Sequence, residues 1–495
     1  MLFNSYEFIF LFLPVVVLGY YAIGRYGTPR LARLWLLAAS LVFYGWWNYR
    51  YLTLLASSVV INFQVGRTLE RQHREGRPSW LLTALAVLFN LGLLGYYKYA
   101  NFFVDSFNVV FDGAFTLHQI ILPLAISFFT FQQIGFVVDA YRGETFERDF
   151  LDYALFITSF WQLIAGPIVH HRQVMPQFRR AETYRFHPKQ FSIGLTVFTI
   201  GLFKKLVIAD SLAPYVNSVY GMPGGGFEPT FLEGWIGAFC YTAQIYFDFS
   251  GYSDMAIGLG RLFNIRVPTN FNSPYKSVSI IQFWRRWHIT LSLFLREYCY
   301  YPLGGNRHGR LRKYRNLMVT MVLAGWWHGA GWTFIIFGVI HGFMLITNHS
   351  WREIQGKTKY TGHTGLAPLC ASVLFTFVLV AITLVLFRAP TVADAMALYE
   401  AMFGLNGWSL TSSVGVEWPL AYFALAMSIA WFLPNTNQLM GILGPGETRE
   451  DEIQFGLTRV LRWKPSPLWA LLVGIMFVIA LVNLPKASEF LYFQF

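Results

Sequence analysis

Residues 321–342, MVLAGWWHGAGWTFIIFGVIHG, lie within a run, 316–351, that contains no Asp, Glu, Lys or Arg. As one continuous helix the run would measure about 54 Å at 1.5 Å per residue, whereas crossing a bilayer core needs about 30 Å. Five glycines offer places to break it: Gly325, Gly329, Gly331, Gly338 and Gly342. We therefore predict broken or re-entrant helices over 316–351 that line a cavity, because irregular backbone at membrane depth is tolerated only there.

The rest of the chain has the composition of a protein dissolved in lipid. Of its 495 residues, 55% are hydrophobic and only 13% are charged, whereas a soluble domain carries about 25% charged residues. Apolar runs near bilayer length recur at 8–23, 34–47, 80–96, 191–202, 231–247, 366–387, 418–432 and 468–484. We predict an all-α polytopic membrane protein with one transmembrane domain over 1–495 and roughly eleven spans or half-spans. The first run lacks a basic n-region, so we expect a span there and not a cleaved signal peptide.

The net charge of +12 follows the membrane topology and gives no reason to expect a nucleic-acid partner. Basic clusters follow the first apolar run and a weaker third candidate at 51–65: Arg25, Arg30 and Arg33, then Arg67, Arg71, Arg74 and Arg77. An even number of crossings separates these loops, so the positive-inside rule makes both cytoplasmic. Arg459, Arg462 and Lys464 precede the last run. Both termini are therefore expected outside.

Residues 261–315 are too basic to cross a membrane and too aromatic for an ordinary solvated loop. Ser279 to Gln282, SIIQ, has the pattern of a capping box that opens a helix through FWRRWHITLSLFLREY. Its mixture of Trp, Ile, Leu and Arg is typical of an interfacial or partly embedded helix. We expect this segment on the cytoplasmic side.

Two histidines are the strongest candidates for chemistry. His328 stands in the charge-free run between Trp327 and glycines, where an ionisable group is costly and usually functional. A near-neutral imidazole could take a proton from a reacting hydroxyl group, and the alternative is a histidine that packs between helices. His288, in WRRWHITLS, is the second candidate, with an ordinary interfacial histidine as its alternative. Trp327 is a candidate substrate-binding side chain beside His328.

Charged residues near these histidines are candidates for binding substrate or donor. Arg285 and Arg286 could bind phosphates or a carboxylate, and lipid headgroup contact is the alternative. Asp248 and Asp254 end an apolar span, where structural ion pairing, with arginines of 261–286 as the nearest basic partners, is favoured over a role at the substrate. Lys204 and Lys205 end another apolar run and are expected to extend to the interface.

No metal site is predicted. His170 and His171 are neighbours, and adjacent helical residues do not face one another, so they form a poor ligand pair. The three cysteines lie far apart. His341 and His349 share the charge-free run but are interpreted as packing or interfacial residues.

Several stretches together resemble the membrane-bound O-acyltransferase superfamily, specifically the bacterial branch that includes the alginate O-acetylation membrane protein. They are LPLAISFFTFQQIGFVVDAYRG (122–143), QLIAGPIVHHRQVMPQF (162–178), GLFKKLVIAD (201–210), FDFSGYSDMAIGLGRLFNIRVPTNFNSPY (247–275), FWRRWHITLSLFLREYCYYPLGGNR (283–307) and GWWHGAGWTFIIFGVIHG (325–342). The resemblance runs essentially end to end. YYPLGGNR (300–307) favours this branch over its D-alanylating relative.

The resemblance implies a ring of tilted helices around a central tunnel, in the bacterial inner membrane. It implies that His328 is the family's near-invariant histidine and His288 a second functional one. It also implies that acetyl groups pass from a cytoplasmic donor, acetyl-CoA, to a secreted polysaccharide such as alginate, with no bound cofactor. An extracytoplasmic SGNH hydrolase-like partner and a polysaccharide export complex are the implied partners.

Two other classes of function and the role of the C-terminal aromatic residues stay open at this point. A transporter or export channel would use His328 as a proton relay, and a scaffold would only recruit polysaccharide machinery. The chain ends in SEFLYFQF, residues 488–495, whose aromatic side chains are typical of an interfacial belt. We also weigh the hypothesis that Tyr492 relays the acyl group outward or docks the partner, because similar aromatic tails ending near a tyrosine look like a feature of this branch.

Overall fold

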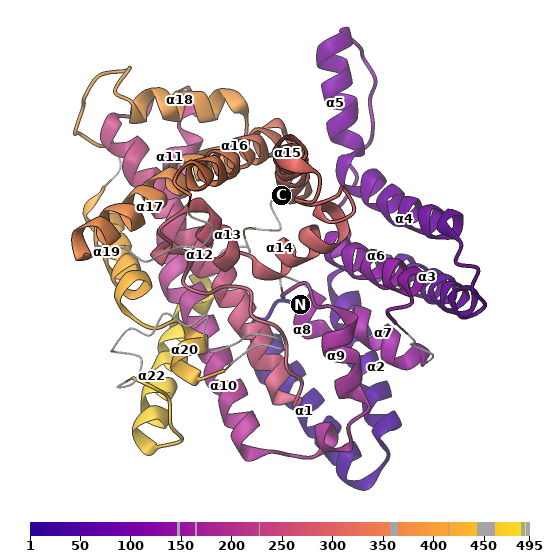
Figure 1. The fold of residues 1–495 in the computed structure, drawn as a ribbon. Helices are drawn as coiled ribbons and strands as arrows, with labels where there is room; N and C mark the ends of the chain where they lie inside the picture. The colour runs from indigo at the N-terminus through magenta and orange to yellow at the C-terminus, as the bar shows by residue number, and fades with distance from the viewer. Residues whose placement is uncertain are drawn as a thin grey trace. The chain divides into compact units, whose positions relative to one another are not determined.

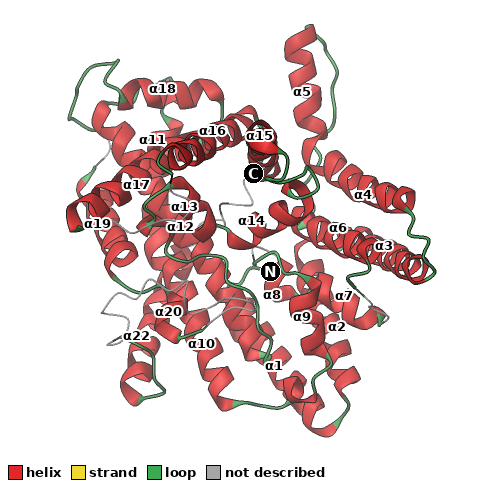
Figure 2. Ribbon diagram, in the orientation of Figure 1, coloured by secondary structure: helices red, strands yellow, loops and turns green. Residues whose placement is uncertain are grey.

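The computed structural model describes residues 1–145, 149–163, 166–226, 228–356, 365–413, 415–442, 461–486 and 491. Every regular element in these ranges is helical (Figure 2), which confirms the all-α prediction. By length and composition, seven helical segments could cross a membrane: Glu7–Tyr26, Tyr51–Arg74, Trp80–Phe111, Pro188–Gly221, Trp332–Ile354, Leu366–Arg388 and Pro467–Lys486. The described residues form two compact units, one with 1–198 and 255–268, the other with 199–254 and the residues from 269 onward.

The first unit begins with an N-terminal helical bundle (Figure 1). Its helices are α1 (Leu13–Tyr26), α2 (Pro29–Asn48), α3 (Tyr51–Arg74), α4 (Trp80–Leu94), α6 (Ile126–Arg142), α7 (Phe150–Thr158), α8 (Phe160–Leu163) and α9 (His171–Phe178). α5 (Ala100–Phe111) projects away from them and buries none of its residues. A buried network of Ser58, Asn62, Asn90 and Gln133 joins α3, α4 and α6 through side-chain hydrogen bonds. Such amides fix helix pairing in a membrane, where apolar packing alone is not directional.

Two long helices pass through both units. α10 (Pro188–Phe203) continues into a π-helical segment, Lys204–Ala209, and then into α11 (Asp210–Gly221). α12 (Phe231–Leu262) carries the apolar run 231–247 at its start and Arg261 at its end. A short 3₁₀ turn, Pro223–Gly225, follows α11.

The second unit holds the segment predicted to be broken. α15 (Gly309–His328) and α16 (Trp332–Ile354) form a helical hairpin whose two arms lie side by side (Figure 1), and the break falls at Gly329–Gly331. The predicted glycine break is thus confirmed. α17 (Leu366–Arg388), α18 (Val392–Met402), α19 (Glu417–Phe432), α20 (Thr436–Met440) and α22 (Pro467–Asn483) follow.

The single helix predicted from Ser279 onward is wrong. Ser279 does cap α13 (Ile280–Arg286) by accepting a hydrogen bond from the backbone of Gln282, but the helix stops there. α14 (Ile289–Leu295) and a π-helical turn, Arg296–Tyr300, continue after a break at His288. The break forms because Asn270 and Asn272, in an extended segment, take the backbone hydrogen bonds of Ile289 and Arg286.

Candidate active site

Close approach between the two arms of the hairpin positions His328. A methyl group on Gly325 would lie 2.3 Å from the carbonyl oxygen of Phe334, and one on Gly338 would lie 2.5 Å from that of Met321. Both positions therefore need glycine. After His328 the chain turns through Gly329, where a side chain would overlap the ring of Phe334. The sequence thereby places an imidazole at the end of a helix, buried where two backbones touch.

The backbone of His288 is left-handed, with φ of 44°. Left-handed conformations are uncommon for non-glycine residues and occur often at functional sites. The conformation places the ring against Asn270, whose Oδ1 lies 3.2 Å from His288 Nδ1. Asn270 Oδ1 also accepts hydrogen bonds from the backbone N–H and the hydroxyl of Thr290. Because this oxygen is an acceptor, His288 Nδ1 carries the proton and Nε2 keeps the basic lone pair.

His288 and His328, the two histidines predicted to take part in chemistry, lie close to each other in the structure. Their ring centroids are 6.1 Å apart, and the indole of Trp327 lies 5.9 Å from the first and 5.1 Å from the second. His288 is 0% exposed and His328 is 3% exposed. Burial lowers the pKa of His288 to about 3, so its ring is neutral near pH 7.

A small, mostly apolar cavity opens beside His328. Its wall is largely aromatic and aliphatic, with Trp287, Phe337 and Phe387 among its members. The other polar side chain in this wall is His341, which the sequence interpretation had treated as a packing residue. An acyl group entering here would meet an imidazole in surroundings that exclude water.

His341 stands in a chain of hydrogen bonds that fixes its tautomer. The indole N–H of Trp284 donates to His341 Nδ1 at 3.2 Å, so the ring proton is on Nε2. Nε2 in turn donates to Thr383 Oγ1 at 2.9 Å, and the Thr383 hydroxyl donates to the carbonyl of Val380. His341 is thus held neutral and oriented at the wall of the cavity. The only feature of the sequence that could have marked His341 as a site residue is its place in the charge-free run 316–351.

Arg285 and Arg286 differ in exposure. Arg285 is exposed, whereas Arg286 is 8% exposed and its backbone carbonyl accepts the N–H of Asn272. Of the two, Arg285 is the side chain that a soluble donor could reach. The donor-binding role of this pair stays a prediction.

Asp248 and Asp254 form ion pairs, but with lysines and not with the expected arginines. Lys204 Nζ lies 2.6 Å from Asp254 Oδ2, and Lys205 Nζ lies 2.6 Å from Asp248 Oδ1 and 2.7 Å from Asp210 Oδ1. The expected extension of these lysines to the interface is also wrong, because Lys205 is 0% exposed. A fully buried ammonium needs such partners. These carboxylates therefore have a structural function in the described chain.

The tail of the chain returns to Asp248. The backbone N–H of Leu491 donates to Asp248 Oδ2 at 3.2 Å, and Leu491 is 3% exposed. Tyr492, like the aromatic residues on either side of Leu491, lies outside the described residues. Its predicted role as an acyl relay stays a prediction.

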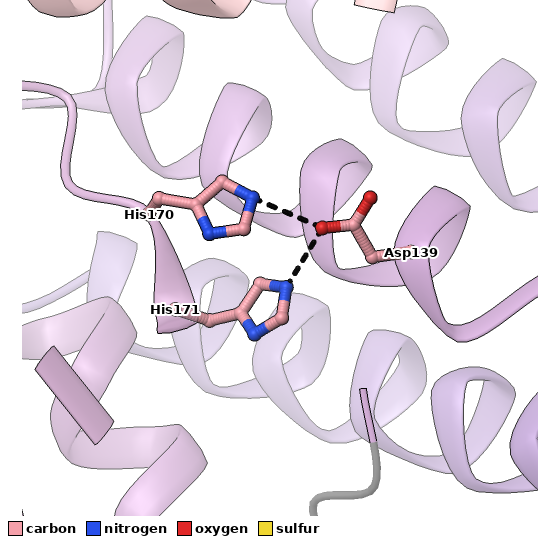
Figure 3. A group of neighbouring side chains, drawn as sticks. All are labelled: Asp139, His170 and His171. Atoms are coloured by element: carbon pink, nitrogen blue, oxygen red, sulfur yellow. Dashed lines mark hydrogen bonds and ion pairs between the residues drawn. The ribbon is translucent and has the colours of Figure 1, made fainter. Parts of the chain in front are cut away.

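His170, His171 and Asp139 form a cluster in the first unit (Figure 3). Both histidine Nε2 atoms face Asp139 Oδ2, at 3.0 and 2.9 Å, and the three side chains offer ligand atoms within 4.8 Å of one another. The geometric reason given for excluding them was wrong, since His170 is the N-cap of α9, with φ of −88° and ψ of 137°, and not a helical residue. Adjacent residues can face one target when one of them is not helical.

The hydrogen bonds of this cluster nevertheless do not suit a metal ion. His170 Nδ1 accepts the backbone N–H of Arg172, so its Nε2 carries the proton that a metal would have to replace. The Arg172 guanidinium also lies 3.1 Å from Asp139 Oδ2. Burial alone would raise the pKa of the Asp139 carboxyl, but the two histidines lower it overall. The cluster is best described as a carboxylate held by three donors.

Comparison with known proteins agrees with the resemblance of the motifs. Residues 147–388 match the family model described as MBOAT, membrane-bound O-acyltransferase family. The chain is 43% identical over 441 residues to a peptidoglycan O-acetyltransferase of Helicobacter pylori, covering 83% of this chain and 81% of that protein. It is 38% identical over 514 residues to a probable alginate O-acetylase of Pseudomonas putida, covering 100% of both chains.

The chain is also similar, more distantly, to enzymes named for the transfer of a different acyl group, D-alanyl. The chain is 28% identical over 263 residues to a teichoic acid D-alanyltransferase of Streptococcus thermophilus, covering 50% of this chain and 61% of that protein. Coverage and identity are both lower than for the O-acetylating relatives. This ordering agrees with the branch expected from residues 300–307.

Proposed function

Since the chain belongs to the membrane-bound O-acyltransferase family and is a membrane O-acetyltransferase, we propose that it moves acetyl groups from cytoplasmic acetyl-CoA across the membrane to a polysaccharide outside the cell. The observation that supports this most directly is the buried pair of His288 and His328, whose ring centroids are 6.1 Å apart, with His328 lining a small, mostly apolar cavity. A scaffold would not need this pair, and the O-acetyltransferase relatives favour acyl transfer over a proton relay in a transporter. The relatives act on alginate and on peptidoglycan, so an exopolysaccharide such as alginate and the cell wall are both candidate acceptors.

In the proposed reaction a hydroxyl oxygen attacks the thioester carbonyl of acetyl-CoA. His328 takes the hydroxyl proton as the carbon–oxygen bond forms, and returns it to the coenzyme A thiolate as the carbon–sulfur bond breaks. His288 is oriented by Asn270 and contacts Trp327, so it is suited to positioning the acyl group or its acceptor. The apolar wall around the cavity keeps water from competing as the nucleophile.

The distribution of charge supports an orientation in the bacterial inner membrane with both termini outside. The donor would then reach the site from the basic face, where the exposed Arg285 is suited to contact its phosphates. On the outer face we propose an SGNH hydrolase-like partner and the polysaccharide export complex as receivers. Tyr492 is proposed to hand over the acetyl group or dock that partner, because Leu491 anchors the tail at Asp248. A phenol suits the relay, since an aryl ester is more reactive than an alkyl ester.

Turnover by the isolated protein tests the function. The full chain is purified, reconstituted in liposomes and given acetyl-CoA on its basic face, with soluble acceptor and the partner on the other. Release of coenzyme A coupled to acetylation of the acceptor is expected. The proposal is wrong if wild-type protein, inserted in both orientations, releases no coenzyme A above the rate of empty liposomes.

A further inference from the structure

Arg261 is a buried guanidinium near the end of α12. It is only 6% exposed, and its one hydrogen bond within the described residues runs from Nη1 to Gln190 Oε1 at 3.0 Å. Among the described residues no carboxylate forms an ion pair with it, and its Nε is buried without a hydrogen-bond partner. Burying a charge without a counter-ion is costly, so this arrangement needs an explanation.

The burial of Arg261 is set by a close helix crossing one turn away. A methyl group on Gly194 of α10 would lie 2.8 Å from the carbonyl oxygen of Gly258 on α12, and one on Gly258 would lie 2.5 Å from the backbone nitrogen of Phe198. The two helices therefore touch through their backbones. Gln190 and Arg261 follow one turn beyond this contact, where the helices hold the guanidinium between them.

A second arginine, Arg266, follows five residues later, and its backbone is held in place. Arg266 is exposed, and its backbone is bracketed by Gln177, which accepts from the N–H of Arg266 at 2.8 Å and donates to its carbonyl at 2.9 Å. Burial lowers the pKa of Arg261 to about 10, and the charge of Arg266 acts in the same direction. Two like charges held together are stabilised by an anion between them.

The free edge of Arg261 has the shape that a phosphate group matches. A guanidinium binds oxyanions best through two parallel N–H groups. Gln190 occupies Nη1, which leaves the edge formed by Nε and Nη2 without a hydrogen-bond partner among the described residues. Because no carboxylate of the described residues pairs with Arg261, this edge is suited to an anion with several oxygens.

The site lies at the basic end of the first unit. Tyr21 of α1 donates to the carbonyl of Leu262 at 2.5 Å, and Tyr20 donates to that of Phe263 at 3.3 Å. The end of α12 is therefore beside the second half of α1, whose last turn carries Arg25 and which is followed by Arg30 in the first turn of α2. By the positive-inside rule this is the cytoplasmic side.

We propose that Arg261 and Arg266 form a binding site for a phosphate ester group on the cytoplasmic face. Its source is either the acyl donor, whose coenzyme A carries three phosphates, or the headgroup of an anionic lipid. The donor assignment rests on the proposed function, whereas the binding of phosphate itself does not.

Binding is tested first without catalysis. The purified full chain in neutral phosphatidylcholine nanodiscs is titrated with inorganic pyrophosphate, and its melting temperature is recorded. Wild type is expected to be stabilised, and Arg261→Gln is expected to lose that response. Arg77→Gln, which removes an exposed arginine of the same unit, serves as the matched control and keeps it. Arg261→Lys retains the charge without the paired N–H groups and is expected to respond weakly.

Two further arms separate the sources. If the donor fills the site, Arg261→Gln raises KM for acetyl-CoA about tenfold at unchanged kcat, as expected for one charge-assisted hydrogen-bond pair, and leaves the KM of an S-acetyl pantetheine lacking phosphates unchanged. If a lipid fills it, phosphatidylglycerol stabilises wild type but not Arg261→Gln, and the KM values agree. A folded Arg261→Gln that matches wild type with pyrophosphate, donor and lipid overturns the site. Wild type that binds pyrophosphate but turns over no acetyl-CoA contradicts the proposed function and not the site.

Discussion

The ring of His288 lies 6.1 Å from the ring of His328, although one belongs to a left-handed break between two short helices and the other ends a long one. Neither helix alone would bury an imidazole at this place. The pair exists because the extended segment at Asn270 and the glycine contact of the hairpin hold the two breaks together. Because a different structural element positions each histidine, each can be mutated without disturbing the backbone that holds the other.

We expect His328→Ala to lower acetyl transfer at least about a hundredfold, because loss of a general base typically costs 10²–10⁴. The measurements are coenzyme A release and acceptor acetylation by purified protein. His349→Ala, in the same charge-free run, is the control and should keep activity. A stable His328→Ala protein with the wild-type rate would contradict the mechanism.

His288→Asn should impair turnover but leave residual activity. Asparagine tolerates the left-handed backbone, so the variant removes the imidazole while keeping the break. Asn270→Ala should have a similar but smaller effect, since it only frees the ring. Full activity in both variants would show that His288 is a packing residue.

The same residue makes stability depend on pH. The pKa of His288 falls from 6.5 in the unfolded chain to about 3 in the folded protein. Below pH 6.5 the unfolded chain takes up a proton that the folded protein does not, so stability is full above pH 6.5 and declines toward pH 3. At pH 5 the loss is about 2 kcal/mol. Thermal unfolding at pH 7 and pH 5 checks this, and His288→Asn should show a smaller difference than wild type.

Lys205→Ala should destabilise the protein by about 3–5 kcal/mol, because it leaves the Asp248 and Asp210 carboxylates buried without their counter-ion. Yield after membrane extraction and melting temperature are the measurements. Lys189→Ala, an exposed lysine near the start of α10, provides the matched control. Equal melting temperatures for the two variants would show that the ion cluster adds nothing to folding.

Arg285→Glu and Arg286→Glu should separate donor binding from folding. The exposed Arg285 is expected to change KM for acetyl-CoA with normal protein yield, whereas the buried Arg286 is expected to reduce yield. If Arg285→Glu leaves the dependence of rate on donor concentration unchanged, Arg285 contacts lipid headgroups instead.

Tyr492→Phe keeps an aromatic ring for the interfacial belt and removes the hydroxyl oxygen. If the tyrosine relays the acyl group, coenzyme A release persists at reduced rate and acceptor acetylation is lost. Full acetylation of the polymer by this variant would leave only the belt.

Patterns local in sequence predicted the helical class, the break at Gly329–Gly331 and the two histidines, because hydrophobic runs and glycines act within a few residues. The predictions that were wrong concern residues whose contacts are far away in the sequence. Trp284 fixes the tautomer of His341, and Lys205 meets Asp248 only where two helices cross. The prediction for His170 failed for a different reason: His170 is the N-cap of α9, so the helix begins at His171 and the two histidines are not both helical.

The two consecutive lysines that begin the π-helical segment after α10 also fix the register of this helix against α12. Lys204 pairs with Asp254 and Lys205 with Asp248, two carboxylates six residues apart on α12. In a membrane, apolar helix faces can slide past one another with little loss of free energy, because the lipid tails are as apolar as the side chains. A slip of one residue here would present each ammonium to the wrong turn and strand a buried charge. The two ion pairs therefore select one alignment of α10 and α12 from many that have similar hydrophobic contact. The same alignment sets which residues meet at the ends of the two helices.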